Sequence, residues 1–180
     1  VTVNGILLSG GIPVLSRFGG LLQMEGGVPS HFAEMIYYEG TSLDPLEIFI
    51  SGRMTSVRQA RDTGRGLIGA SMREIPAVTV PKARRICEKL SAIGLGGVLA
   101  VGKPNRPLLE VPVAHGRAGI VVAGGLNPLA ATVEAGIATR NKALTGLFPF
   151  QQLVDCTRLR DELEAVRQGR RAAAVAAPST

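Results

Sequence analysis

Residues 119–137 read "GIVVAGGLNPLAATVEAGI", in which an apolar run leads through two glycines into a segment with helix signals. Asn127 is expected to cap that helix with its side-chain oxygen, and Pro128 suits the first helical position because its φ angle is already fixed. Gly136 fits the left-handed residue that commonly ends a helix. A strand that turns directly into a short helix favours a fold in which helices pack onto a β-sheet.

The glycine turn inside this unit is also a candidate binding site. Backbone N–H groups at the start of a helix point toward one place, and glycines let a ligand approach the backbone closely, so the turn is suited to an anion. The alternative interpretation is structural, because many strand-glycine-helix turns in α/β proteins bind nothing.

The remaining segments extend the same pattern of short strands and helices. Asp44, Pro45 and Glu47 form a strong helix start, and Gly64 is expected to end the next helix. Spacing of apolar residues predicts a helix with one buried face over 81–93, and the fully apolar run 97–102 is typical of a strand buried between layers. Strands are predicted at residues 2–10, 19–27, 31–40, 67–75, 97–102, 119–123 and 137–146, and helices at 41–52, 55–64, 81–93, 124–137 and 157–168.

Length and composition indicate one folded domain. The chain has 180 residues, 46% of them hydrophobic and 19% charged, which is typical of a globular protein with a single core. We therefore predict an α/β fold with a mixed β-sheet covered by helices in a single domain, with residues 1–169 as the folded domain and 170–180 as a disordered tail. The first residue, Val1, suggests that the sequence is a piece of a longer polypeptide.

Charge and targeting signals narrow the class of partner. The net charge is +6, but no block of five or six like charges occurs, so a dedicated nucleic-acid arm is not indicated and acidic small molecules are favoured. No uncharged run reaches the roughly 18 to 20 apolar residues that cross a bilayer, and no signal peptide is evident. Cys87 and Cys156 are best explained as unpaired thiols. We expect a cytoplasmic protein with no membrane association.

Motifs for common enzyme chemistry fail on their context. "GRGLIG" at 64–69 precedes a strand instead of a helix, and "GVLAVGK" at 97–103 has Pro104 where a phosphate-binding loop needs Ser or Thr. His31 and His115 lack the spacing of metal ligands, and no nucleophile elbow occurs. The residues therefore favour a binding module without a metal or cofactor over an enzyme.

Turns rich in Gly, Asn, Thr and Arg are the remaining candidates for a ligand site. Such turns lie at strand ends, where open α/β sheets bind their ligands, and the nearby cations suit a small polyanion. The alternative is that the cations lie on the surface or pair with glutamates. The candidate ligand-binding residues are Thr41, Ser42, Arg73, Lys103, Asn105, Arg106, Gly124, Gly125 and Asn127.

Several long strings in the chain resemble one family. "EGTSLDPLEIFI", "MREIPA", "GVLAVGKPNRPLLEVPV" and "GRAGIVVAGGLNPLAATVEAGI" are similar to the effector domain of the nitrogen-regulation repressors named NrpR, over about Val3 to Leu144. The resemblance implies a repressor of nitrogen-assimilation genes in which this domain senses 2-oxoglutarate as inducer. It also implies that DNA is bound only through a winged-helix domain, which is not present in this chain.

A mechanism follows from that implied ligand. 2-Oxoglutarate carries two carboxylates, so its pocket needs two anion-binding ends, for which the Gly124, Gly125 and Asn127 turn and one of Arg73, Lys103 or Arg106 are the candidates. A ligand can change the affinity for DNA only if it binds one arrangement of two paired domains more tightly than another. We therefore expect the protein to form a homodimer. Two other functions stay open, an enzyme acting on a keto acid or phosphorylated metabolite and a dimerisation domain that is indifferent to ligand.

Overall fold

The computed structural model describes residues 2–141, 146–147, 149–152, 158, 161 and 163–164. The chain divides into a first compact unit, Val1–Thr139, and a second unit, Arg140–Thr180. The first unit contains every strand of the described residues, and the second contains a short 3-10 helix, Phe150–Gln152. The predicted boundary between residues 169 and 170 lies outside the described residues and stays a prediction.

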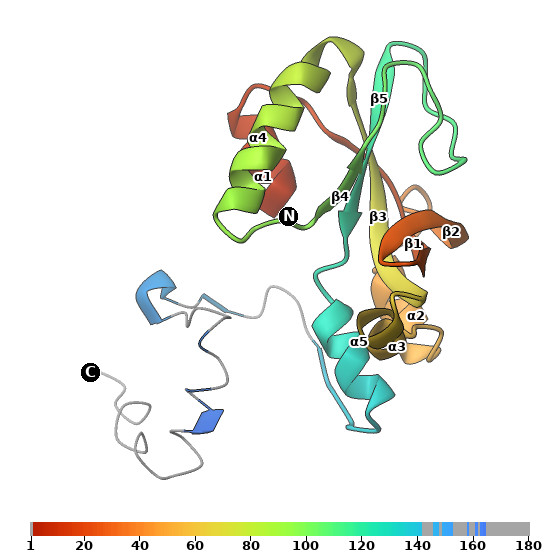
Figure 1. The fold of residues 1–180 in the computed structure, drawn as a ribbon, viewed down its shortest axis with the longest axis vertical. Coiled ribbons are helices and arrows are strands. Elements are labelled where there is room, and N and C mark those ends of the chain that lie inside the picture. Colours follow the sequence, from red (N-terminus) through yellow and green to blue (C-terminus); the bar gives the residue numbers. More distant parts are fainter. Residues whose placement is uncertain are drawn as a thin grey trace. The chain divides into compact units, whose positions relative to one another are not determined.

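A five-stranded sheet in the order β2-β1-β3-β5-β4 forms the centre of the first unit (Figure 1). Its strands are β1 (Leu15–Glu25), β2 (Val28–Tyr37), β3 (Gly66–Pro76), β4 (Val98–Val101) and β5 (Arg117–Ala123). All four neighbouring pairs are antiparallel. The predicted α/β class with helices on a sheet is confirmed, but the described strands contain none of the parallel pairs that a mixed sheet would have. Long β1 and β3 supply most of the pairing, and the consecutive strands β1 and β2 form a hairpin.

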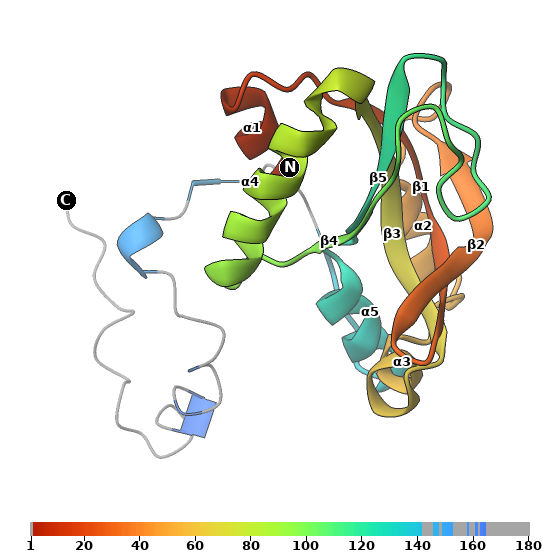
Figure 2. The same ribbon diagram turned by 45° about the horizontal axis from the view of Figure 1, so that its top comes forward.

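Helices lie at two ends of one face of the sheet. The described helices of this unit are α1 (Thr2–Ser9), α2 (Pro45–Ser51), α3 (Val57–Thr63), α4 (Val80–Ala92) and α5 (Asn127–Glu134), with a 3-10 turn at Ala77–Thr79 before α4. Figure 2 shows α1 and α4 together on one side, well apart from α3 and α5. Two helix groups with a gap of sheet between them therefore frame one stretch of β3 and β5.

Two apolar clusters fill the two faces. Beneath α1 and α4, the sheet residues Ile75, Ala118, Ile120 and Val122 pack with Leu7. On the opposite face the sheet presents its own buried residues, which are covered by apolar side chains of the loop 102–116. These sheet residues are Phe18, Leu22, Phe32, Ala70, Met72 and Val121. Because alternate residues of a strand point to opposite faces, β3 and β5 contribute to both clusters.

Several element predictions are confirmed by the helix ends. The Asp44 side chain accepts a hydrogen bond from the Leu46 N–H at 2.9 Å, and Pro45 begins α2 as expected. Gly64 follows α3 with φ of 73°, in the left-handed region that favours glycine. The helix predicted over 81–93 is α4, with Ala83 and Leu90 on its buried face.

The prediction for residues 2–10 is wrong, because the segment is a helix and not a strand. Leu7 is fully buried under α4 while its neighbour Leu8 is 64% exposed. Val3, one turn before Leu7, packs against the same cluster. The apolar run 2–10 fits both the two-residue period of a strand and the 3.6-residue period of a helix. The segment forms a helix because Val3 and Leu7, one turn apart, then pack together onto the sheet.

Three further predictions are corrected or stay partly open. The strand at 98–101 is a half-buried edge strand instead of a strand buried between layers. Asn127 is the first residue of α5 and makes no cap; the cap position is Leu126. Residues 137–141 contain no strand, and residues 142–145 of that expected strand lie outside the described residues, as does most of the helix predicted at 157–168.

Candidate functional site

The glycine turn after β5 is fastened to β3 by an unusual set of contacts. The Gly124 N–H donates to the Gly69 carbonyl at 2.7 Å. The Asn127 side chain completes the match, since its oxygen accepts from the Gly69 N–H at 2.8 Å and its amide donates to the Gly69 carbonyl at 2.9 Å. The Asn127 amide thus adds to the Gly124–Gly69 backbone bond just beyond Ala70 and Ala123, the last paired residues of β3 and β5. This geometry explains why Asn127 is not a helix cap: both of its polar groups are already used.

Close packing at this turn requires glycine. A side chain at Gly124 would place its Cβ 2.7 Å from Leu46 Cδ1 and 2.9 Å from the Gly69 oxygen. At Gly125, by contrast, a Cβ would meet nothing within 4 Å, and the residue is exposed. Gly124 therefore lets α2 and β3 approach the turn, while Gly125 leaves it open toward solvent.

A cavity of about 1150 Å³ lies between the two helix groups, over β3 and β5. Residues 2–4 of α1, Leu90 of α4 and the loop 94–97 line one side of the cavity. Its other side holds Asp44, Leu46 and the turn 123–126, and its polar floor holds Tyr38, Ser71 and Arg73. Most of these elements are far apart in sequence, so the cavity exists only in the folded sheet.

Arg73 is the charged group of the cavity floor. Its side chain is only 9% exposed, and its guanidinium donates through Nε to the Asn4 oxygen and through Nη1 to the Ser71 hydroxyl. Within the described residues, no carboxylate lies at ion-pair distance from it. Burial lowers the pKa of Arg73 from its ordinary value, against a smaller opposite effect of Tyr38. A nearly buried cation without an anionic partner costs free energy that an incoming carboxylate would offset.

Tyr38 stands beside this cation. Burial raises the pKa of its phenol, with Asp44 acting in the same direction and Arg73 and Ser71 in the opposite one. Its backbone N–H donates to the Arg17 carbonyl at 3.1 Å, which ties the residue to β1. The phenol therefore stays protonated at neutral pH and offers one hydrogen-bond donor next to Arg73.

The structure brings only part of the predicted ligand site together. Arg73, Gly124 and Gly125 line the cavity, and Asn127 holds the turn in place from behind. Thr41 and Ser42 lie in the loop before α2, outside the lining, where the Thr41 hydroxyl accepts from the Leu43 N–H.

The other three predicted residues lie in the loop between β4 and β5. Lys103, Asn105 and Arg106 are exposed, and Asn105 holds the loop through Arg117 and Gly116. That loop joins the beginning of β5, whereas the glycine turn follows its end, so β5 separates the two.

Sequence reasoning missed several polar residues of the cavity, among them Asn4, Tyr38 and Ser71. Asn4 was placed in an expected strand, Ser71 lies in the middle of a strand, and Tyr38 directly follows the end of β2. The one available signal was alternation in β3, because Ser71, Arg73 and Ile75 share a face. That pattern marks a polar stripe on the sheet without showing what covers it.

Other chemistry finds no support in the described part of the chain. No group of three or more His, Cys, Asp or Glu side chains there could hold a metal ion. Cys87 is free, and burial raises the pKa of its thiol despite nearby Arg84. Cys156 lies outside the described residues. No helix in this part of the chain has the length and apolar character needed to cross a membrane.

Comparison with known proteins places these features in one family. The family model described as "NrpR regulatory domains NRD1 and 2" matches residues 1–155. The global nitrogen regulator NrpRI of Methanosarcina mazei is 37% identical over 153 residues, covering 85% of this chain and 47% of that protein. The global nitrogen regulator NrpR of Methanococcus maripaludis is 32% identical over 153 residues, which cover 85% of this chain and 26% of that protein.

A solved structure supports the same relationship. The crystal structure of a nitrogen repressor-like protein from Methanococcus jannaschii superposes with a TM-score of 0.65 at 30% sequence identity, covering 79% of this chain and 59% of that one. The chain spans between about a quarter and a half of the length of the curated relatives it matches. These relatives are named as regulators, in agreement with the expectation of a regulatory domain and not an enzyme.

Proposed function

The chain belongs to the family of NrpR regulatory domains, and on that basis we propose that it is the ligand-sensing domain of a repressor of nitrogen-assimilation genes, with 2-oxoglutarate as inducer. The single observation that carries the choice of ligand class is Arg73. A nearly buried guanidinium on a cavity floor, with no carboxylate partner among the described residues, favours an anionic ligand.

The cavity offers a second anion-binding end. The turn 123–126 lines its wall, and among the described residues the N–H groups of Gly125 and Leu126 in this turn make no hydrogen bond. A dicarboxylate would place one carboxylate on Arg73 and the other at this turn. The exposed Gly125 leaves the approach to the turn unobstructed.

Transmission of the signal belongs to the same proposal. The cavity separates α1 and α4 from α2 and α5, so a ligand that contacts both sides favours whichever spacing of the two groups fits it. In the complete repressor, a homodimer would convert that preference into a change in DNA affinity. Within this proposal, the operator is bound by the winged-helix domain that the family resemblance implies.

Thermal unfolding with and without 2-oxoglutarate tests the proposal. Ligand at a hundredfold over its Kd adds about 2.7 kcal/mol of stability, which corresponds to a rise in Tm of about 5 to 10 °C for a domain of this size. Succinate, glutamate and glutamine serve as control ligands and should give smaller shifts. No shift from a folded sample at millimolar 2-oxoglutarate would contradict the ligand and favour the ligand-independent dimerisation domain.

Two arginine variants make the test specific for the cavity. Arg73→Gln should abolish the Tm shift, and Arg73→Lys should weaken it because a lysine keeps the charge but cannot bind a carboxylate bidentately. Arg106→Gln is the matched control, since Arg106 is exposed and outside the cavity lining. Loss of the shift in the Arg106 variant with retention in the Arg73 variants would place the site elsewhere.

A further inference from the structure

Selective binding of 2-oxoglutarate in the cavity requires a residue that recognises the keto group as well as one that recognises the negative charge. Its volume of about 1150 Å³ far exceeds a five-carbon acid, so shape alone cannot separate 2-oxoglutarate from glutarate, which lacks only the keto oxygen. Arg73 binds either acid equally well, because it recognises a carboxylate that both contain. Selectivity for a keto acid therefore requires a hydrogen-bond donor close to Arg73.

Tyr38 occupies the required position. A Cβ at Gly19 would lie 3.4 Å from the Tyr38 hydroxyl oxygen, which places that hydroxyl over β1 at the cavity floor. Gly19 pairs directly with Ser71 of β3, and the Ser71 hydroxyl accepts from Arg73 at 2.5 Å. The phenolic hydroxyl and the guanidinium therefore lie over adjacent strands on the same face, with Ser71 between them.

Local packing holds the phenol in this place. The Tyr38 N–H donates to Arg17 of β1, and Pro45 at the start of α2 lies against the same glycine, 2.8 Å from the position of its absent Cβ. A larger residue at position 19 would displace both Pro45 and the hydroxyl. The donor is thus positioned before any ligand arrives, which lowers the entropy cost of recognition.

We propose that the Tyr38 hydroxyl donates a hydrogen bond to the 2-keto oxygen of the ligand while Arg73 binds the neighbouring carboxylate, which makes Tyr38 the residue that selects 2-oxo acids. This inference rests on the proposed function and adds the group that determines its specificity. A phenol donates one hydrogen bond to a carbonyl oxygen, whereas the methylene of glutarate offers no acceptor. Glutarate therefore leaves the hydroxyl to water or Ser71.

Calorimetric titration of 2-oxoglutarate and glutarate into three versions of the full chain tests the inference. The wild-type protein should bind 2-oxoglutarate more tightly than glutarate. Tyr38→Phe should weaken 2-oxoglutarate about threefold to tenfold, the range for one neutral hydrogen bond, and leave glutarate unchanged. Tyr37→Phe is the matched control, because Tyr37 is the adjacent residue, 48% exposed and outside the cavity lining.

The possible outcomes distinguish the role of Tyr38 from the proposed function as a 2-oxoglutarate sensor. Equal preference for 2-oxoglutarate in wild type and Tyr38→Phe would overturn the role of Tyr38 while leaving the sensor function intact. An equal loss of both acids in a variant with an unchanged Tm would also overturn it, because the phenol would then support the cavity and not read the keto group. Binding of neither acid by the wild-type protein would refute the proposed function itself.

Discussion

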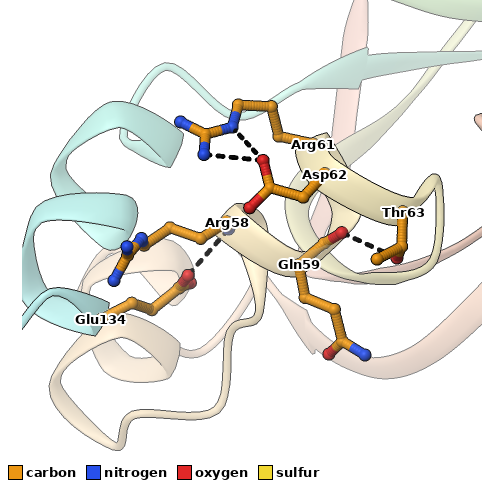
Figure 3. A network of polar contacts seen from close by, with 6 residues as sticks. All are labelled: Arg58, Gln59, Arg61, Asp62, Thr63 and Glu134. Carbon is orange, nitrogen blue, oxygen red and sulfur yellow. Dashed lines mark hydrogen bonds and ion pairs between the residues drawn. The ribbon is translucent and has the colours of Figure 1, made fainter.

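Single side chains replace missing backbone partners at two places in this fold. Asn127 pairs with both polar groups of Gly69. Glu134 accepts from the Val57 N–H at the start of α3 and from the Arg58 N–H, the second of which is drawn in Figure 3. Ser56 cannot cap α3, because its hydroxyl accepts from the Leu67 N–H at 2.7 Å. Both contacts join α5 to elements about sixty to eighty residues away, so the glycine turn is held from both ends of α5.

The first prediction concerns the charge on Glu134. Burial opposes ionisation of this carboxylate, but hydrogen bonds from Arg58, Thr55 and Val57 outweigh it and lower its pKa below the ordinary 4.5. A lowered folded-state pKa contributes stability above the unfolded pKa, and that contribution disappears as pH falls through the folded one. Glu134→Gln should therefore lower the free energy of unfolding at pH 7 by about 1 kcal/mol, with a smaller difference near pH 3.

Urea denaturation at the two pH values measures this difference. Glu88→Gln is the control, since Glu88 is exposed on α4 and its substitution should change stability by less than about 0.5 kcal/mol. A Glu134 variant that differs from wild type equally at both pH values would show that ionisation of the carboxylate is not what stabilises α3.

At the scale of elements, the turn between β5 and α5 combines a rigid residue with an open one. Gly124 is buried against β3 and α2, while Gly125 is exposed and a Cβ added there would contact nothing within 4 Å. Leu46 of α2 reaches both Gly69 and Gly124, so α2, β3 and the turn meet at one place. A ligand at this turn would therefore contact a junction of three elements instead of a free loop.

The second prediction compares alanine at these two adjacent glycines. Gly124→Ala should lower the free energy of unfolding by about 1 to 3 kcal/mol, because the new methyl group meets the Gly69 backbone as well as the movable end of Leu46. Gly125→Ala should change it by less than about 0.5 kcal/mol. Chemical denaturation measures both, and equal effects would contradict the packing described for the turn.

At the scale of the whole molecule, all elements that build the cavity lie within Val1–Thr139. The sheet, both apolar clusters and every residue of the cavity lining belong to this unit. The family model extends further, to residue 155. The cavity therefore depends on long-range pairing within the first unit, above all on β3, which joins the hairpin to β5.

The third prediction follows from that confinement. A chain that ends after Thr139 should keep its cooperative unfolding and its Tm shift with 2-oxoglutarate, because it retains the complete sheet and cavity lining. A chain that ends at residue 155 is the matched control, since it contains the whole family match. Loss of the shift in the shorter chain alone would show that residues 140–155 contribute to ligand binding.

The sequence by itself determined most elements and the class of fold. Local signals are short-range, so Asp44 and Pro45 at α2, Gly64 after α3 and the apolar run of β5 could be recognised without the structure. The same strings identified the family, which the comparisons confirm. The segment 2–10 shows the limit, because its apolar residues satisfy two periods and only packing on the sheet selects the helix.

Only the tertiary structure decided where the candidate site lies. Alternation along β3 puts Ser71 and Arg73 on one face, but Asn4, Tyr38 and the turn 123–126 reach that face through pairing across the sheet. Lys103 and Arg106 lie far from the glycine turn, because they belong to the loop before β5 and the turn follows β5. The whole length of that strand lies between them. Such contacts are set by the burial of distant apolar faces against each other, a long-range effect that no local pattern encodes.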